Sequence, residues 1–453
     1  MTTETPTASA GYRSYVLFAL IVVYTFNFID RQILGILAIP IQADLGLSDT
    51  QLGLMRGVSF ALFYSTLGVP VAMLADRWNR VRIMTIALTL WSAFTMVCGL
   101  ATNFTQMFLA RMAVGVGEAG GVAPAYSIVS DYFPPDKRAG ALGAYSFGVP
   151  LGSAIGIVFG GVIATVLDWR SAFFIVGGLG ILIAPIFLLT VREPKRGGFD
   201  AVGSKTTAAP FGEVMATLLK KPSFWLLSIG GAFSSIVAYG MFAWMPAFLV
   251  RLFGDELPGA MSWVPSFLIP PNAGPVLYAA YFYGALLAVG GVFGIWLGGA
   301  VADRYGAKFK GIYALAPGVA FLLTVPLMIF GLNTNSLVTT FFAFLLPTAF
   351  SLAWLGPALS AFQNMVGPSM RATSGATFLL INNLIGLGFG DFFIGRMSDF
   401  YKTEFGNESL RYSMLTAVGF YVVAAILYFI ATPRLKKDWH YGDAQSAPAP
   451  SGG

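Results

Sequence analysis

Long apolar segments alternate along this chain with short polar ones that are rich in glycine, proline and charge. About 20 consecutive apolar residues are enough to cross a bilayer as a helix. Twelve segments of this kind are predicted, at residues 14–38, 50–75, 83–101, 105–130, 138–165, 170–190, 223–252, 275–301, 311–331, 335–362, 369–395 and 410–431. The pattern therefore predicts an all-α integral membrane protein with twelve transmembrane helices.

Composition supports this class and excludes several kinds of site. Apolar residues make up 56% of the chain, charged residues only 11%, and the mean hydropathy is +0.73, far from the values of soluble domains. A single cysteine, Cys98, and a single histidine, His440, exclude a disulfide framework, a multi-cysteine metal site and a histidine-based triad. The phosphate-binding pattern G-x4-G-K-[ST] does not occur, which argues against an ATP-driven pump. We expect no enzyme activity, no metal and no cofactor, with the proton as coupling ion.

Basic residues predict the orientation in the membrane. With a cytoplasmic N-terminus, nineteen Lys and Arg residues lie inside and five lie in outer loops or at their edges. We expect both termini in the cytoplasm and an inner, bacterial-type membrane. The net charge of +6 then reflects topology and attraction to anionic lipids, and nucleic-acid binding is not expected. The expected partners are membrane lipids and a small amphipathic or anionic substrate, and the protein is expected to act as a monomer.

The second half of the chain repeats the first. The sequence LADRWNRVR at 74–82 follows the second span, and VADRYGAK at 301–308 follows the eighth, so that Asp76 and Asp303 are 227 residues apart. Two six-helix bundles are predicted at 14–191 and 223–432. They are flanked by an N-terminal segment at 1–13, a linker at 192–222 with room for an interfacial helix over 211–221, and a disordered tail at 433–453.

These features together resemble the major facilitator superfamily. The repeated Asp-Arg loop is the most specific part of the match, and the sequences NFIDR at 27–31, RMAVGVGEA at 111–119 and DWRSAFF at 168–174 are similar to the spinster branch. The resemblance implies two pseudo-symmetric six-helix bundles that alternate access by rocking. It also implies proton-coupled transport of sphingosine-1-phosphate-like or lysophospholipid substrates. Symporters of small organic anions share the Asp-Arg pair of the first span and the arginine and glutamate of the fourth, so they remain an alternative.

The first and fourth predicted spans contain four charged residues, Asp30, Arg31, Arg111 and Glu118, at a depth where charge is costly and marks a functional pathway. Arg111 and Glu118 are seven residues apart, which places them on one helix face about 10.5 Å apart along the axis. Either Asp30 or Glu118 could therefore reach Arg111. We predict that Asp30 and Glu118 bind and release protons, and that Arg111 alternates between these carboxylates and an anionic headgroup. A static ion pair that locks the bundle is the alternative.

Arg31 and two further charges, Arg56 and Asp391, each have more than one possible partner. Arg31 lies 100° around the helix from Asp30, so it could point to a neighbouring helix, extend to the interface or contact substrate. Arg56, near the outer end of the second span, could be interfacial or recruit an anion. Asp391, near the outer end of the eleventh span, is expected to pair with Arg396 or to cap a gate.

The Asp-Arg loops are predicted to form a cytoplasmic gate. Asp76 can accept hydrogen bonds from the free amides that begin the eleventh span near Arg371, and Asp303 can do the same at the fifth span near Arg138. These contacts exist only when the cytoplasmic ends of the halves meet, so they favour the outward-open state. The basic residues Arg77, Arg80 and Arg304 complete the predicted gate.

Uncharged side chains of the second half complete the predicted cavity. Aromatic residues in such proteins are most often packing or lipid-facing; if some line the cavity, it is half charged and half apolar and suits an ionic head with a long tail. The predicted tail-binding residues are Tyr239, Trp244, Trp354, Phe378 and Asn382. We therefore expect a proton-coupled secondary transporter of a lysolipid-like substrate. A symporter of small organic anions and a multidrug exporter are the alternatives.

Overall fold

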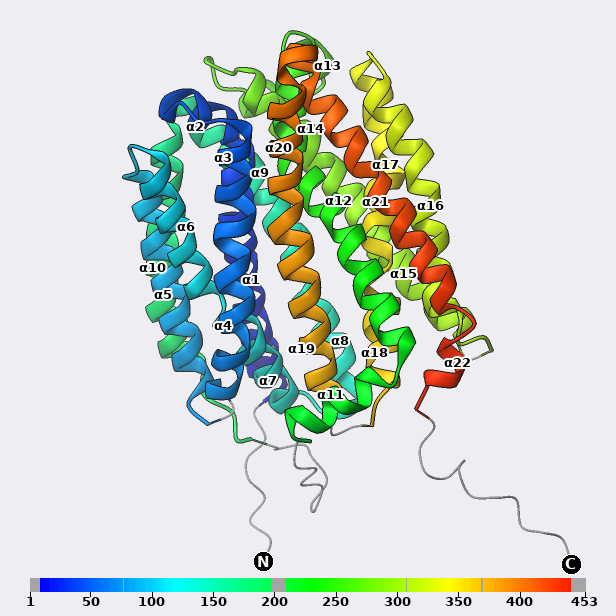
Figure 1. The fold of residues 1–453 in the computed structure, drawn as a ribbon. Helices are drawn as coiled ribbons and strands as arrows, with labels where there is room; N and C mark the ends of the chain where they lie inside the picture. Colours follow the sequence, from blue (N-terminus) through cyan, green and yellow to red (C-terminus); the bar gives the residue numbers. More distant parts are fainter. Residues whose placement is uncertain (1–8, 76, 197–208, 307, 368–369, 441–453) are drawn as a thin grey trace, which may run out of the picture. The chain divides into compact units, whose positions relative to one another are not determined.

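The computed structural model describes residues 9–75, 77–196, 209–306, 308–367 and 370–440, and all regular elements in these ranges are helices (Figure 1). Eleven stretches of these residues are long and apolar enough to cross a membrane. The last of them, Thr373–Ala431, has 59 residues, which is enough for two crossings. The predicted all-α membrane fold is thus confirmed, and its twelve spans are accounted for.

The helices of the first half correspond to the first six predicted spans, several of them divided into shorter pieces. Their bounds are α1 (Ala10–Ile36), α2 (Ala38–Leu45), α3 (Asp49–Gly53), η1 (Leu54–Val58), α4 (Ser59–Ala75), α5 (Arg80–Gly99), α6 (Phe104–Glu118), α7 (Val122–Tyr132), α8 (Pro135–Ser146), α9 (Gly148–Val166) and α10 (Trp169–Thr190).

The second half follows the same plan, after a short helix that precedes its first span. The bounds are α11 (Phe211–Leu219), α12 (Pro222–Phe253), α13 (Leu257–Ala260), η2 (Ser266–Leu268), α14 (Pro275–Leu286), η3 (Leu287–Gly291), α15 (Val292–Tyr305), α16 (Ile312–Asn333), α17 (Leu337–Ala353), α18 (Leu355–Asn364), α19 (Arg371–Asn382), η5 (Asn383–Leu387), α20 (Gly388–Phe405), η6 (Gly406–Glu408), α21 (Ser409–Ala431) and α22 (Leu435–Asp438).

Polar side chains define where several of these helices begin. The side chains of Asn79, Asn103 and Asp168 each accept a hydrogen bond from the backbone amide three residues later, at the starts of α5, α6 and α10. Such caps satisfy amides that have no partner inside the helix. The short polar loops of the sequence therefore contain the start signals of the spans that follow them.

The chain forms two compact units, which we call the first and the second unit. The first unit comprises Met1–Ser204, Tyr239–Ala288 and Leu387–Met414, and the second comprises Lys205–Ala238, Val289–Gly386 and Leu415–Gly453. The first unit thus includes two segments of the second half, because α14 packs on α9, and α20 packs on α3 and η1. The compact units do not coincide with the two six-helix bundles expected from the repeat.

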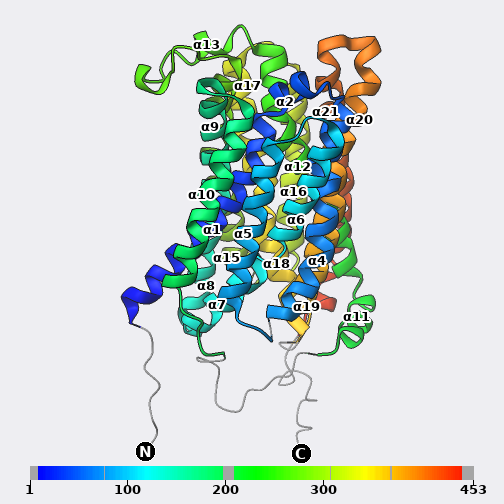
Figure 2. The same ribbon diagram turned by 90° about the vertical axis from the view of Figure 1, so that its left-hand side faces the viewer.

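Within the first unit, glycines allow helices to approach closely. Helix α1 packs along α9, and α5 packs along α10 (Figure 2). A β-carbon at Gly156 of α9 would lie 2.8 Å from the α-carbon of Ile29 in α1, which is closer than side chains tolerate. In the second unit, a β-carbon at Gly290 of η3 would lie 3.0 Å from the Leu345 carbonyl oxygen of α17. Glycine thus allows close helix packing within each of the two units.

The segments flanking the second half differ in part from their predictions. The short helix expected in the linker is present as α11, whose Val214 and Leu218 are buried while Phe211 and Leu219 are exposed. The tail is not disordered from residue 433, since α22 lies within it and the Asp438 carboxylate accepts a hydrogen bond from the Ser223 amide at 2.8 Å. Residues 197–208 and 441–453 lie outside the described part of the chain.

Candidate functional site

The fourth predicted span is two helices rather than one. Helix α6 ends at Glu118 and α7 begins at Val122, with the glycine-rich residues between them forming a turn. Glu118 therefore lies at the carboxyl end of a helix, where the helix dipole disfavours a negative charge. A buried carboxylate at this position needs a cationic partner.

The glycines around Glu118 bring neighbouring helices close to it. A β-carbon at Gly115 would lie 2.8 Å from the carbonyl oxygen of Phe60, and one at Gly117 would lie 2.6 Å from the backbone nitrogen of Trp91. The side chain of Glu118 is 0% exposed as a result. This close approach removes water from the carboxylate.

Two ion pairs connect α1 to α6, and they involve all four of the charges singled out in the first and fourth spans. Arg31 Nε donates to Glu118 Oε2 at 2.7 Å, and Arg111 Nη1 donates to Asp30 Oδ1 at 3.4 Å. The hydroxyl of Thr95 in α5 donates to the other oxygen of Asp30 at 2.7 Å. Asp30 and Arg31, which are adjacent in α1, thus bind two residues that lie two helical turns apart on α6.

This pairing differs from the one expected. Glu118 was expected to share Arg111 with Asp30, but its partner in the structure is Arg31. Arg31 does not extend to an interface, because its long side chain reaches the α6 end while Asp30 occupies Arg111. One guanidinium nitrogen of Arg31 and the second oxygen of Glu118, both buried, have no hydrogen-bond partner among the described residues.

Aromatic rings surround the guanidinium of Arg31. Its central carbon lies 5.1 Å from the ring centre of Phe28, 4.7 Å from that of Phe60 and 4.6 Å from that of Tyr64. Cation–π contacts of this kind favour a positive charge in a water-poor place. The cage holds Arg31 between Glu118 and the cavity described below.

A third buried pair joins Arg56 to Asp391. Arg56 lies in η1, a π-helical turn, and its Nε is 3.9 Å from Asp391 Oδ2 of α20. Both side chains are at most 5% exposed. Asp391 thus pairs with Arg56 and not with Arg396, because η1 packs directly on α20. A β-carbon at Gly57 would lie only 2.7 Å from the Gly388 carbonyl oxygen. Arg56 is buried rather than interfacial.

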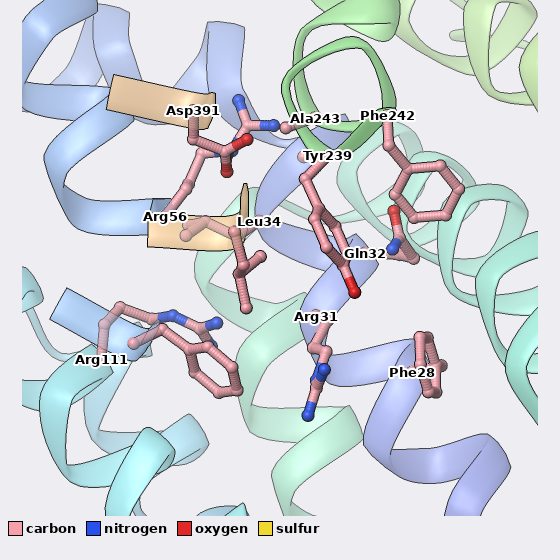
Figure 3. Close-up of a pocket in the computed structure, with 13 residues that line it drawn as sticks. Phe28, Arg31, Gln32, Leu34, Arg56, Arg111, Tyr239, Phe242, Ala243 and Asp391 are labelled. Atoms are coloured by element: carbon pink, nitrogen blue, oxygen red, sulfur yellow. Dashed lines mark ion pairs between the residues drawn. The ribbon is translucent and has the colours of Figure 1, made fainter. Parts of the chain in front are cut away.

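Members of all three pairs line one cavity in the first unit (Figure 3). Its wall is formed by Phe28, Arg31, Gln32, Leu34, Gly35, Arg56, Phe60, Arg111, Tyr239, Phe242, Ala243, Leu387 and Asp391. The space free for the centres of water-sized molecules is about 50 Å³, room for a few waters. Three arginines facing an otherwise mainly apolar wall can bind an anionic group beside an apolar one.

The predicted tail-binding residues are divided between the units. Tyr239 lines the cavity, and Trp244 is buried next to it, with its ring centre 5.2 Å from the Arg56 guanidinium carbon. Trp354, Phe378 and Asn382 belong to the second unit and are buried in its own packing: Trp354 contacts Phe378 edge-on, and Asn382 accepts a hydrogen bond from Ser235.

The predicted cytoplasmic gate is described only in part. Asp76 and the side chains of Asp303 and Arg138 lie outside the described residues, and Arg77, Arg304 and Arg371 are exposed. Arg80 is 1% exposed and donates to Asp131 and Glu193 of the first half at 2.5 and 2.6 Å. The guanidinium of Arg80 therefore joins α5 to α7 and to the segment after α10, and it is not free to gate.

A second charged cluster, which the sequence analysis did not identify, lies where α3 meets α20. The Asp399 carboxylate accepts from the Thr50 amide at 2.7 Å, and Arg251 binds both oxygens of Asp49 at 2.6 and 2.8 Å. We call Asp49, Arg251 and Asp399 the latch. It joins both halves at the end predicted to face outward. The only local signal was the capping box that begins at Ser48.

Comparison with known sequences gives a consistent family. The profile of the Major Facilitator Superfamily matches residues 20–391. The chain is 32% identical to an MFS-type efflux pump of Mycolicibacterium smegmatis, with 92% of each chain covered. It is 29% identical to protein spinster homolog 1 of Xenopus tropicalis, covering 86% of this chain and 74% of that one.

Solved structures agree with these relatives. A bacterial homolog of the human lysosomal transporter Spinster, in an inward-facing and unoccupied conformation, is 35% identical with a TM-score of 0.84, covering 96% of this chain and 100% of that one. The occupied inward-facing form gives a TM-score of 0.80 at 34% identity and the same coverage.

Proposed function

The chain belongs to the Major Facilitator Superfamily and is a transporter of the spinster type, not an enzyme, and on this premise we propose that it moves an amphipathic, lysolipid-like substrate coupled to protons. The substrate class comprises sphingosine-1-phosphate and lysophospholipids. The proposed membrane is an inner, cell membrane, with both termini in the cytoplasm.

One observation carries the proposal. The guanidinium of Arg31 contacts Glu118 and also lines the cavity. An anionic headgroup that binds Arg31 takes the counter-charge away from Glu118, and a buried carboxylate without a counter-charge binds a proton more readily. Substrate binding and proton uptake are thereby linked through one side chain. Arg111 and Asp30 form a second pair that can act in the same way.

The proposed transport cycle requires the cavity to open. A space of about 50 Å³ holds a few waters, far less than a lysolipid with its tail. Alternating access in this superfamily moves one half against the other around a central site. We propose that the latch holds the outward end closed in the conformation described here, and that the loops around Asp76 and Asp303 close the cytoplasmic end in the opposite one.

A chain-length series tests the lipid substrate. Each methylene moved from water into an apolar site contributes about 0.8 kcal/mol, so ligands with one anionic head should bind about fourfold tighter per added carbon until the site is full. Affinities would be measured below the micelle threshold with protein in nanodiscs. Trp354 and Phe378 do not line the cavity in the conformation described here. We propose that they contact the tail once the cavity opens, so that their substitution flattens this slope. Flat binding across the series, with tight binding of a short dicarboxylate, would instead establish a transporter of small organic anions.

Drug export is the second candidate, and it rests on the efflux pump of Mycolicibacterium smegmatis. The cavity residues Phe28, Phe60, Tyr239 and Phe242 give apolar drugs a surface to contact. Export of uncharged or cationic drugs by Arg111→Lys at the wild-type rate would favour this function, because a drug site does not need an anion-binding fork.

A further inference from the structure

We propose that Arg56 and Asp391 form a second polar subsite of the cavity, one that binds an uncharged hydroxyl of the substrate beside its anionic head. The inference rests on the proposed transport of an amphipathic substrate, and it adds a specificity determinant to that function. A glycerol-type secondary hydroxyl is the chemical group that fits.

Of the three ion pairs with members in the cavity wall, Arg56–Asp391 has the longest distance between its partners. Its Nε–Oδ2 distance of 3.9 Å exceeds the 2.7 Å of Arg31–Glu118 and the 3.4 Å of Arg111–Asp30. Figure 3 shows Arg56 and Asp391 together on one side of the cavity, apart from the side chain of Arg31. The two residues are therefore close enough to share one small group, and too far apart to satisfy each other.

Three atoms of the pair lack a hydrogen-bond partner in the part of the chain that the structure describes. They are Nη1 and Nη2 of Arg56 and Oδ1 of Asp391, all fully buried. Buried donors and acceptors without partners cost free energy, so native sites rarely leave several in one place. A hydroxyl can accept from a guanidinium and donate to a carboxylate at once, and so it matches this set of atoms.

The charge of the pair selects a neutral group. Arg56 and Asp391 cancel, so an added anion would place an uncompensated negative charge next to Asp391 in a medium of low dielectric constant. The other titratable groups that act on the pair are Tyr239, Tyr283, Arg111 and Asp49. Tyrosine is uncharged near neutral pH, and Arg111 and Asp49 are already bound to Asp30 and Arg251.

Backbone contacts fix the width of the gap. A β-carbon at Gly57 would lie 2.7 Å from the Gly388 carbonyl oxygen and 3.1 Å from the β-carbon of Asp391. The Trp244 indole donates to the Asp391 carbonyl at 3.1 Å and so holds the start of α20 from the other side. Arg56 also lies in a π-helical turn, an arrangement that is common at functional sites. The subsite is therefore preformed.

Two synthetic lipids that differ by a single hydroxyl test the proposal. These are 1-O-dodecylglycerol 3-phosphate and 3-(dodecyloxy)propyl phosphate, which have the same head and the same tail. A site built to bind a hydroxyl rejects the analogue without it, because its own polar groups are then left unpaired. We expect the full-length protein in nanodiscs to bind the hydroxylated lipid at least about tenfold tighter than the deoxy lipid.

Variants of Arg56 and Asp391 test whether this affinity ratio depends on the pair. Asp391→Asn should reduce the affinity ratio, and Arg56→Met combined with Asp391→Leu should bring it to about one, because replacing both partners by apolar groups of similar size removes the site without leaving a lone charge. Asp44→Asn is the control, since Asp44 pairs with Arg170 outside the cavity, and it should keep the wild-type ratio. Asp391→Asn alone keeps the test valid if the double variant does not fold.

The outcomes separate this inference from the proposed function. If wild type binds both lipids equally well, the proposed function stands and the hydroxyl subsite is wrong, with water as the natural occupant. A wild-type ratio that persists in both pair variants also overturns the subsite. If neither lipid binds, the lysolipid function fails and the inference fails with it.

Discussion

Arg31 donates a 2.7 Å hydrogen bond from Nε to Oε2 of Glu118, although the two residues are 87 positions apart in the sequence. The bond joins the carboxyl-terminal part of α1 to the carboxyl end of α6. Glu118 is fully buried, whereas the Arg31 side chain is 14% exposed and faces the cavity. An anion that bound Arg31 from the cavity would therefore compete with Glu118 for the guanidinium, without having to touch Glu118 itself.

We predict that Glu118→Gln abolishes proton-coupled transport while leaving the protein folded. Glutamine has nearly the same volume and can still bond to Arg31, but it cannot take up a proton. In reconstituted vesicles, a pH gradient should drive substrate accumulation by wild type and not by the variant.

A matched carboxylate provides the control for this experiment. Glu193 also binds an arginine, Arg80, but it lies outside the cavity, so Glu193→Gln should retain coupled transport. Accumulation by Glu118→Gln at the wild-type level would remove Glu118 from the coupling mechanism.

Arg111→Lys should weaken binding of anionic lipids of every chain length by a similar factor, about tenfold. Lysine keeps the charge but loses the planar fork that binds phosphate or carboxylate through two parallel hydrogen bonds. The increase in affinity per added carbon should stay unchanged, because Arg111 is proposed to bind the head and not the tail. Arg170→Lys, at a pair outside the cavity, should leave both quantities at wild-type values. A changed slope with an unchanged head contribution would place Arg111 in the tail site.

The sequence predicted the spans and the charged residues inside them better than it predicted which charges meet. Apolar length and the position of a charge within a span are local properties, so they can be read along one helix. Pairing depends on how helices cross, and a helical wheel that separated Arg31 from Asp30 by 100° did not show that a long arginine side chain reaches α6. The contact of Thr50 with Asp399 spans 349 positions and leaves no local pattern.

Weakening the latch should shift the population between the inward-facing and outward-facing states. Asp399→Asn should favour opening at this end, because a neutral amide stabilises the amino end of α3 less than a carboxylate, by about 0.3–1 kcal/mol, or about two- to fivefold in population. Spin labels at the exposed positions Ala43 and Lys402 would report the distance, and the native Cys98 is buried. Asp76→Asn should shift the distribution in the opposite direction, toward the inward-facing state.

Asp168→Asn is the control for the latch. Asp168 also caps a helix with its carboxylate, but the helix is α10 and the contact stays within the first half. Its distance distribution should match wild type. An unchanged distribution in Asp399→Asn would mean that Asp49 and Arg251 hold this end closed without it.

Two glycine substitutions should have opposite effects on stability. A β-carbon at Gly117 would lie 2.6 Å from the backbone nitrogen of Trp91, so Gly117→Ala forces α6 away from α5 at an expected cost of about 1–3 kcal/mol. A β-carbon at Gly178, inside α10, meets no atom within 4 Å, so Gly178→Ala should be neutral or stabilising by up to about 1 kcal/mol, because alanine favours the helix. Thermal unfolding of the purified variants in nanodiscs measures both effects.

The Gly117 variant should also lose transport, since the same shift moves the adjacent Glu118 away from Arg31. If Gly117→Ala unfolds at the wild-type temperature and transports normally, then close helix contact at this position does not hold the carboxylate in place.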